Sequence, residues 1–263
     1  MRVRLTAILL VIVSVGSQAL AADPLATARR LYNLGQYDRA LDAAREAAAN
    51  PAMAAAARLV MGRINLERYR QSAQSSDLDD AHAALQDLDP RTLDGRERVE
   101  LQVGLAELLY FDEYFGAAAE VFDPILESSI SLGPEAHERV LDWWATALDR
   151  QAQTSPERIS IYERIVARME QELRRDAGSS PAAYWLAAAA RGTGRLDRAA
   201  AAAKAGWIRA GAARDRGAAL RADQDRLVTQ AIIPDRAGRA PSRDRRQVIA
   251  NLTAEWEKFK KVW

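Results

Sequence analysis

Cysteine is absent from this 263-residue sequence, and histidine occurs only twice. Without cysteine the chain has no disulfide framework, no thiol nucleophile, no zinc–thiolate site and no lipid attached to an N-terminal cysteine. The two histidines, His82 and His137, each stand alone in a helical segment rather than at the spacing of metal ligands. We therefore predict no metal site and interpret both histidines as exposed helix side chains.

The short motifs of common catalytic sites are also missing. There is no Gly-x-Ser-x-Gly elbow and no phosphate-binding loop, and Gly192-Thr193-Gly194 is too short for a dinucleotide-binding fingerprint. The acidic cluster at residues 77–80 begins a helix, where negative charge is favourable near the positive end of the helix dipole. The sequence predicts no cofactor and no enzymatic activity, and a pair of catalytic carboxylates stays open as the alternative.

A charge excess of one sign is lacking too. Lysine and arginine together number 37 and aspartate and glutamate 36, so bulk charge does not favour nucleic acid as a partner. Alanine is abundant, in runs such as residues 187–190 and 199–203, within a hydrophobic fraction of 49%. Alanine is the best helix former, and its small side chain permits close contact between helices. These features predict an all-α protein.

The first 21 residues have the layout of a secretory signal peptide. A basic start with Arg2 and Arg4 precedes an apolar run at residues 5–15 and an Ala-Leu-Ala cleavage pattern at residues 19–21. The apolar run is short for a bilayer span, so we expect cleavage and no transmembrane segment afterwards; an uncleaved membrane anchor is the alternative. Abundant alanine and arginine are typical of a GC-rich bacterial genome, which indicates a periplasmic or secreted protein.

A signal for a helical hairpin recurs along the chain. It consists of a glycine expected at positive φ in the turn, a large residue two positions later and an alanine three positions after that. The clear copies are Gly35, Tyr37 and Ala40, and then Gly194, Leu196 and Ala199. Weaker copies occur at residues 77–81 and 113–117, and the spacing of the copies predicts a diverged one within residues 134–169.

This pattern resembles the tetratricopeptide repeat family, in which a turn glycine, an aromatic residue and small residues on the second helix allow hairpins to stack. The resemblance covers residues 22–212 and is strongest at the two ends. It departs from the family in period, because the units exceed the usual length of about 34 residues. The resemblance implies an α-solenoid, and a helix-rich bundle with chance spacing is the alternative.

Solenoids of this kind usually bind partners in a concave groove that the first helix of each hairpin lines. Matched to the family pattern, the groove candidates are Arg29, Asn33, Arg63, Tyr110, Trp185 and Arg191. Arginines beside aromatic residues would grip an acidic or carboxylate-ended peptide, although no lysine–asparagine clamp for a carboxylate is visible. The alternative places Trp185 in the core and leaves the arginines as solvated surface.

These observations predict an exported, non-catalytic interaction module or scaffold of the bacterial cell envelope that binds a protein or peptide partner. The competing hypothesis is a helical enzyme or accessory domain that acts on cell-envelope polymers.

The sequence changes character after residue 212. Residues 213–233 predict one further helix, and residues 234–243, with two prolines and a glycine, predict a mobile basic linker. Residues 244–263 predict an amphipathic helix. Its apolar stripe consists of Ile249, Leu252, Trp256, Phe259 and Trp263. We interpret this helix as a cap over the open end of the solenoid; docking to a partner, or peripherally to an envelope membrane, is the alternative.

Overall fold

The computed structural model describes residues 23–213 and 216–263, and all regular structure in these ranges is helical, with no strand. The predicted all-α class is confirmed. The longer helices are α1 (Pro24–Asn33), α2 (Tyr37–Ala48), α3 (Ala54–Ser72), α4 (Ser75–Leu85), α5 (Gly95–Phe111), α6 (Phe115–Phe122), α7 (Pro134–Thr154), α8 (Arg158–Arg175), α9 (Ser180–Gly192), α10 (Leu196–Arg209), α11 (Gly217–Leu227), α12 (Ile233–Gly238) and α13 (Arg245–Val262). The predicted signal peptide, residues 1–21, lies outside the described residues.

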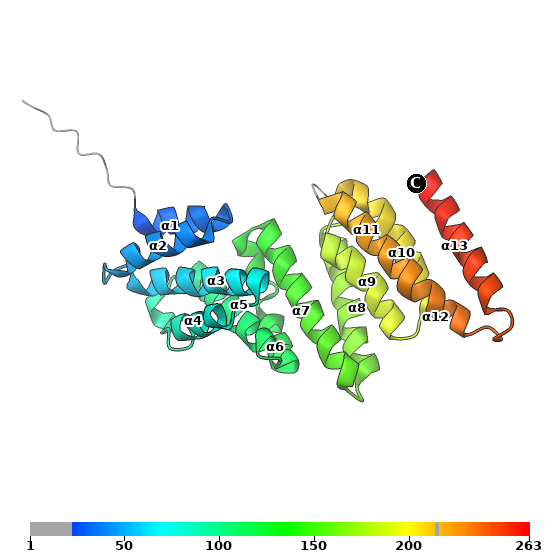
Figure 1. Ribbon diagram of the computed structural model, residues 1–263, viewed down its shortest axis with the longest axis horizontal. Coiled ribbons are helices and arrows are strands. Elements are labelled where there is room, and N and C mark those ends of the chain that lie inside the picture. Colours follow the sequence, from blue (N-terminus) through cyan, green and yellow to red (C-terminus); the bar gives the residue numbers. More distant parts are fainter. Residues whose placement is uncertain (1–22, 214–215) are drawn as a thin grey trace, which may run out of the picture.

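The helices form an elongated array in which neighbours in sequence are neighbours in space (Figure 1). Each helix from α1 to α10 packs against the next one along the chain. A second set of contacts joins alternate helices, because α1, α3, α5, α7, α9 and α11 also touch one another in that order. The odd-numbered helices therefore make a continuous row along one side of the array. Within the described ranges, no helix combines the length and hydrophobicity that a bilayer span requires.

Local sequence signals explain where several helices begin. The Asp23 side chain accepts a hydrogen bond from the backbone N–H of Leu25, and Pro24 occupies the first turn of α1. Asp94 and Glu97 form a reciprocal capping box at the start of α5. Such caps pair backbone N–H groups that the first turn of a helix leaves without partners.

The hairpin turns after α1, α5 and α9 share one hydrogen-bond pattern. In each turn a residue at positive φ donates its N–H to the carbonyl three positions back, and the next residue donates to the carbonyl five positions back. The residues at positive φ are Gly35 (φ 69°), Glu113 (φ 65°) and Gly194 (φ 76°). The positive φ predicted for Gly35 is thus confirmed, and the turn after α5 uses a glutamate at the same position.

Replacing Gly35 or Gly194 by valine should lower the free energy of unfolding by about 1 kcal/mol or more, because a β-branched residue resists positive φ. At Gly35 no atom lies within 4 Å of an added Cβ, so backbone strain alone is tested. Gly238→Val is the matched control, because Gly238 also has open space around it but no positive φ. Urea denaturation measures the three variants, and equal midpoints would contradict the turn geometry.

The opposite change at Glu113 should stabilise the protein. Glu113 holds a positive φ that costs an L-residue about 1 kcal/mol, and glycine removes this cost. We expect Glu113→Gly to raise the free energy of unfolding by somewhat less than about 1 kcal/mol, because glycine also gains freedom in the unfolded chain. Denaturation of the variant beside the parent checks this, and a destabilised Glu113→Gly would contradict it.

Small residues allow the helices to approach closely. A Cβ added at Gly62 in α3 would lie 2.4 Å from Cγ of Leu85 in α4, and one added at Gly192 would lie 2.5 Å from the Tyr162 ring. Ala40 and Ala199 are fully buried at the corresponding positions of α2 and α10. The repeated alanine and glycine positions therefore serve packing between helices.

The predicted linker at residues 234–243 is wrong over its first half. Residues 233–238 form α12, which continues from α11 through a π-helical segment at Val228–Ile232. Pro234 stands in the first turn of α12, where a proline is tolerated. Ile233 and Ala237 lie on one side of this helix and are 4% and 1% exposed. Burial of these two side chains favours the helix over an open linker.

The end of the array has its own apolar core. Trp256 of α13 is buried among alanines of α9 and α10 and the aliphatic side chains of Val228, Ile232 and Ile233. The predicted apolar stripe of α13 is buried only at its centre, because Ile249 is 41% and Trp263 62% exposed.

Candidate functional site

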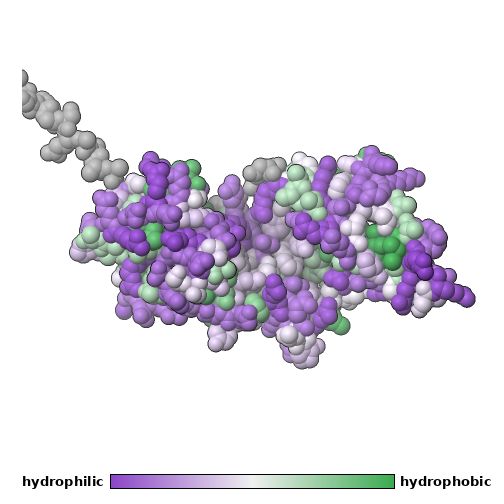
Figure 2. Space-filling model, in the orientation of Figure 1, coloured by the Kyte–Doolittle hydropathy of each residue, from purple (hydrophilic) through white to green (hydrophobic). Residues whose placement is uncertain are grey.

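A groove of about 1460 Å³ opens along the odd-numbered helices α1, α3, α5 and α7. Its lining comes from these four helices, from the turn after α1, from Tyr37 at the start of α2, from the residues before α7 and from Arg216. The surface over the α1–α5 end of the molecule is mostly hydrophilic (Figure 2). The groove itself has charged side chains from all four helices, among them Arg29, Arg63, Glu107 and Arg139.

Three polar side chains gather within the groove. The Tyr32 hydroxyl oxygen and Arg63 Nε are buried and have no hydrogen-bond partner among the described residues. Glu107 is 6% exposed, and its carboxylate lies 3.7 Å from Arg63 Nε, which is beyond hydrogen-bonding distance. Burial raises the pKa of Glu107 despite the opposing charge of Arg63.

Each arginine of the groove faces a glutamate. The ion pairs are Arg29–Glu97 at 2.5 Å, Arg63–Glu107 at 3.7 Å, Arg96–Glu100 at 3.1 Å, Arg139–Glu67 at 3.3 Å and Arg216–Glu138 at 3.2 Å. These five pairs compensate the positive charge locally. The groove therefore has no excess of cationic groups that would select an acidic partner on charge alone.

Three of the six predicted groove residues, Arg29, Asn33 and Arg63, line the groove together. The other three do not line it. Tyr110 packs edge-on against Trp143 of α7, with ring centroids 4.7 Å apart. Trp185 is 7% exposed, as in the alternative that placed it in the core, and its Nε1 donates to Asp142 at 2.8 Å.

Arg191 does not line the groove, because it pairs with an aspartate that the sequence placed in the predicted linker. Its Nε donates to the Asp235 carboxylate at 2.7 Å, and Asp235 belongs to α12, the helix that replaces part of the predicted linker.

Two residues that line the groove, Tyr32 and Glu107, were not among those predicted from the sequence. Tyr32 stands three positions after Arg29, and Glu107 follows Glu100 and Val103 at helical spacing, so the faces of α1 and α5 carried a signal for both.

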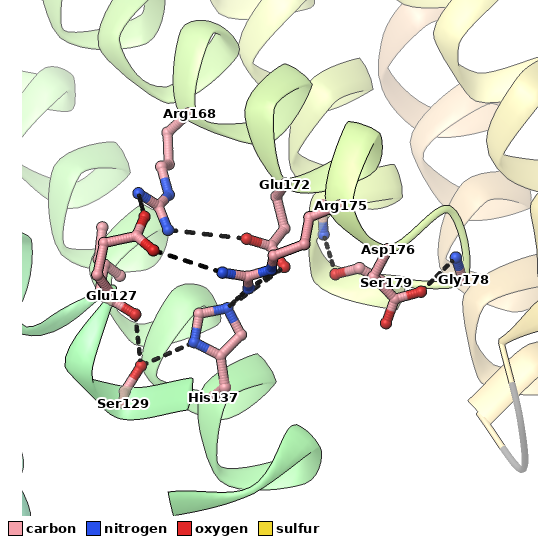
Figure 3. Close-up of polar contacts among 11 residues, drawn as sticks. Glu127, Ser129, His137, Arg168, Glu172, Arg175, Asp176, Gly178 and Ser179 are labelled. Atoms are coloured by element: carbon pink, nitrogen blue, oxygen red, sulfur yellow. Dashed lines mark hydrogen bonds and ion pairs between the residues drawn. The ribbon is translucent and has the colours of Figure 1, made fainter. Parts of the chain in front are cut away.

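A second polar cluster lies inside the protein at the junction of α7 and α8 (Figure 3). Ser129 Oγ lies 2.7 Å from His137 Nδ1, and His137 Nε2 lies 3.3 Å from the Glu172 carboxylate. Arg175 contacts both His137 and Glu172. The prediction of an exposed His137 is wrong, because its ring is covered by α8 and is 4% exposed. His82 is half-buried and lies 3.1 Å from Asp112.

The Ser129–His137–Glu172 cluster has the residue types of a hydrolytic triad but not its arrangement. The Ser129 hydroxyl is fully buried and donates to the Leu126 carbonyl at 2.8 Å. We infer that His137 Nδ1–H then donates to the serine oxygen. With a proton already on Nδ1, the imidazole does not receive the serine proton, as a general base would.

The acid of this cluster is held ionised. Burial alone would raise the pKa of Glu172, but the hydrogen bond and charge of His137 and the charge of Arg175 lower the pKa below its ordinary value. Arg168, with a side chain 13% exposed, also lies 3.7 Å from the Glu172 carboxylate. The cluster joins α8 to the start of α7, so its contacts indicate a role in stability.

In the described part of the chain, no group of three or more histidine, aspartate or glutamate side chains is arranged to hold a metal ion. Comparison of the chain with protein-family models, with curated proteins and with solved structures found no match.

Proposed function

We propose that this chain is an exported, non-catalytic interaction module of the tetratricopeptide-like solenoid type that binds a protein or peptide partner in its groove. One observation carries the proposal: the groove is lined mainly by α1, α3, α5 and α7, which are the first helices of successive hairpins. In helical solenoids the first helices form the concave binding surface. The shared turn geometry after α1, α5 and α9 supports the repeat interpretation.

The proposal is tested by blocking the groove. Asn33 and Ala136 line it from α1 and α7, so Asn33→Trp with Ala136→Trp should fill part of it. The mature chain and this variant serve as baits for envelope extracts and for a displayed library of linear peptides. The matched control is Asn251→Trp, an exposed site on α13. Partners retained by the parent and the control but lost by the groove variant would support groove binding; partners retained by all three would contradict it.

Export is tested separately. We expect the full-length chain, expressed in a bacterial host, to appear in the periplasmic fraction with a new N-terminus near residue 22. N-terminal sequencing checks this, and a cytoplasmic chain that begins at Met1 would contradict it.

The second candidate function is catalysis on cell-envelope polymers, and it rests on buried carboxylates. Glu107 lines the groove with a raised pKa, and Glu67, 8% exposed, lies close enough to contribute to that shift. A raised pKa is typical of a general acid. Each carboxylate is also paired with an arginine, which a structural role explains. Release of soluble fragments from purified cell-wall polymer by the parent but not by Glu107→Gln would favour this function over the first.

A further inference from the structure

We propose that the edge of the molecule between α12 and α13 docks peripherally on a phospholipid bilayer with anionic headgroups. Its arginines, which we call the basic edge, lie in the loop after α12 and in the first turn of α13 and are Arg239, Arg243, Arg245 and Arg246. The basic edge lies at the end of the array far from α1, whereas the groove follows α1, α3, α5 and α7 (Figure 1). The proposal therefore does not depend on groove binding.

The basic edge has a local excess of positive charge in a chain that is nearly neutral. Residues 239–246 contain four arginines and one acidic residue, Asp244, whereas the whole chain has 37 basic and 36 acidic residues. Two carboxylates at the same end of the array, those of Asp235 and Asp197, are paired with arginines outside the basic edge at 2.7 and 2.9 Å. Neighbouring acids therefore do not cancel this positive charge.

Most contacts of these arginines leave their charge uncompensated. Arg239 donates to a backbone carbonyl in the turn after α9, and Arg245 donates to two backbone carbonyls shortly before it in the chain. Arg246 has no hydrogen bond or ion pair with the described residues. Arg243 faces the Asp244 carboxylate at 3.6 Å, and its side chain is 88% exposed. The basic edge thus presents guanidinium groups that can form charge-assisted hydrogen bonds with phosphate oxygens.

An adjoining apolar side chain favours a bilayer over other carriers of phosphate. Residues 241–247 are all exposed, so the basic edge can contact many headgroups of a flat bilayer at once. Ile249, 41% exposed, follows Arg245 and Arg246 at spacings of four and three residues, so the three side chains share one side of α13. Peripheral proteins bind anionic membranes through basic residues together with apolar side chains that enter the headgroup region. A nucleic acid or a free phosphate offers no such apolar layer.

The experiment measures binding of the mature chain to lipid vesicles. The mature chain is used because the apolar run at residues 5–15 would bind lipid by itself. Sedimentation with phosphatidylglycerol vesicles is compared with sedimentation with phosphatidylcholine vesicles, in about 10 mM and about 150 mM salt, where the Debye lengths are about 30 and 8 Å. We expect binding to the anionic vesicles alone, and weaker binding at the higher salt concentration.

The decisive comparison uses two matched double variants. Arg243→Gln with Arg246→Gln should lower the partition coefficient on phosphatidylglycerol about 30-fold, because each arginine near an anionic surface contributes roughly fivefold. Arg30→Gln with Arg150→Gln removes the same charge from exposed positions on α1 and α7 and should stay close to the parent. Circular dichroism checks that both variants keep the parent's helical content.

Contact of Ile249 with the bilayer is tested with a tryptophan reporter. Ile249→Trp should add fluorescence that brominated phosphatidylglycerol quenches when the protein binds. Asn251→Trp is the matched control, because residues two positions apart face different sides of a helix, and its added fluorescence should be quenched much less. Equal quenching of the two reporters would contradict docking by this side of α13 and would overturn the proposal.

Three further results would also overturn it: no binding to phosphatidylglycerol vesicles, equal binding to both lipids, or equal losses in the two double variants. Sodium phosphate should release the bound protein no better than sodium chloride of the same ionic strength; selective release by phosphate would assign the basic edge to a free anion. A DNA duplex that binds through Arg243 and Arg246 more tightly than the vesicles would assign it to nucleic acid. Either assignment would contradict docking on a bilayer.

Discussion

Replacing Trp256 by alanine is expected to lower the free energy of unfolding by about 3–5 kcal/mol, the usual cost of removing a fully buried tryptophan. The Trp256 ring is 2% exposed and packs on Trp207 and Phe259, with centroids 5.5 and 5.6 Å away. Its Nε1 also donates to Asp225 at 2.8 Å. The variant loses this packing and leaves a cavity at the end of the array.

Trp263→Ala is the matched control, because the same residue type on the same helix is 62% exposed. We expect this change to stay within about 0.5 kcal/mol of the parent. Thermal and urea denaturation measure both variants, and each kcal/mol should shift Tm by roughly 2–4 °C in a chain of this size. Equal effects of the two substitutions would contradict the docking of α13 on α10 and α12.

Deletion of residues 242–263 tests whether α13 is a cap. The deletion uncovers Val228, Ile232 and Ile233, which line the core under Trp256. Each large apolar side chain that loses its cover forfeits up to about 1.5–3 kcal/mol. A cap predicts a lower Tm and aggregation. An unchanged Tm with loss of partner binding would instead favour the docking interpretation.

Sequence motifs predicted the structure best where the conformation depends on the residue itself and on its neighbours in the chain. Gly35 and Gly194 marked hairpin turns because positive φ strongly favours glycine. The same turn after α5 gave a weaker signal, because Glu113 occupies its positive-φ position. The helix α12 was missed because two prolines and a glycine favour a linker in isolation, whereas burial of Ile233 depends on helices far away in the sequence.

Only part of the candidate site was predicted from the sequence. Arg29, Asn33 and Arg63 belong to α1 and α3 and line the groove. Trp185 and Arg191 face partners on α7 and α12, whose positions the family pattern did not give. The missing α12 accounts for Arg191 directly, since Asp235 was assigned to a linker. Buried contacts between residues on different helices, such as His137 on α7 with Glu172 on α8, leave no periodic signal in either segment.

Replacing Glu172 by alanine should destabilise the protein by about 3–5 kcal/mol, the usual cost of removing one partner of a buried ion pair. Glu172 is 2% exposed and contacts His137, Arg175 and Arg168. Without its carboxylate, the largely buried Arg168 keeps its ion pair with Glu127 at 2.6 Å but loses the one with Glu172. Glu163→Ala is the control, because the Glu163–Arg195 pair is solvent-exposed and worth about 0–1 kcal/mol. Similar destabilisation by both changes would contradict a special role for the buried cluster.

The pH dependence of the difference in unfolding free energy between the parent and Glu172→Ala identifies the electrostatic contribution of Glu172. Because the folded-state pKa of Glu172 is lower than its ordinary value of 4.5, the unfolded chain binds more protons at this site than the folded one in the interval between the two values. The stability that the ionised carboxylate contributes is therefore complete above about pH 4.5 and is lost as the pH falls through the folded-state pKa. Glu172→Ala lacks this contribution of the carboxylate, so the difference in unfolding free energy between parent and variant should become smaller in acid. Urea titrations from neutral pH down to about pH 3 measure the gap across the range in which carboxyl groups titrate. A gap that stays constant would assign the loss to packing and would contradict the charge interaction of Glu172 with His137 and Arg175.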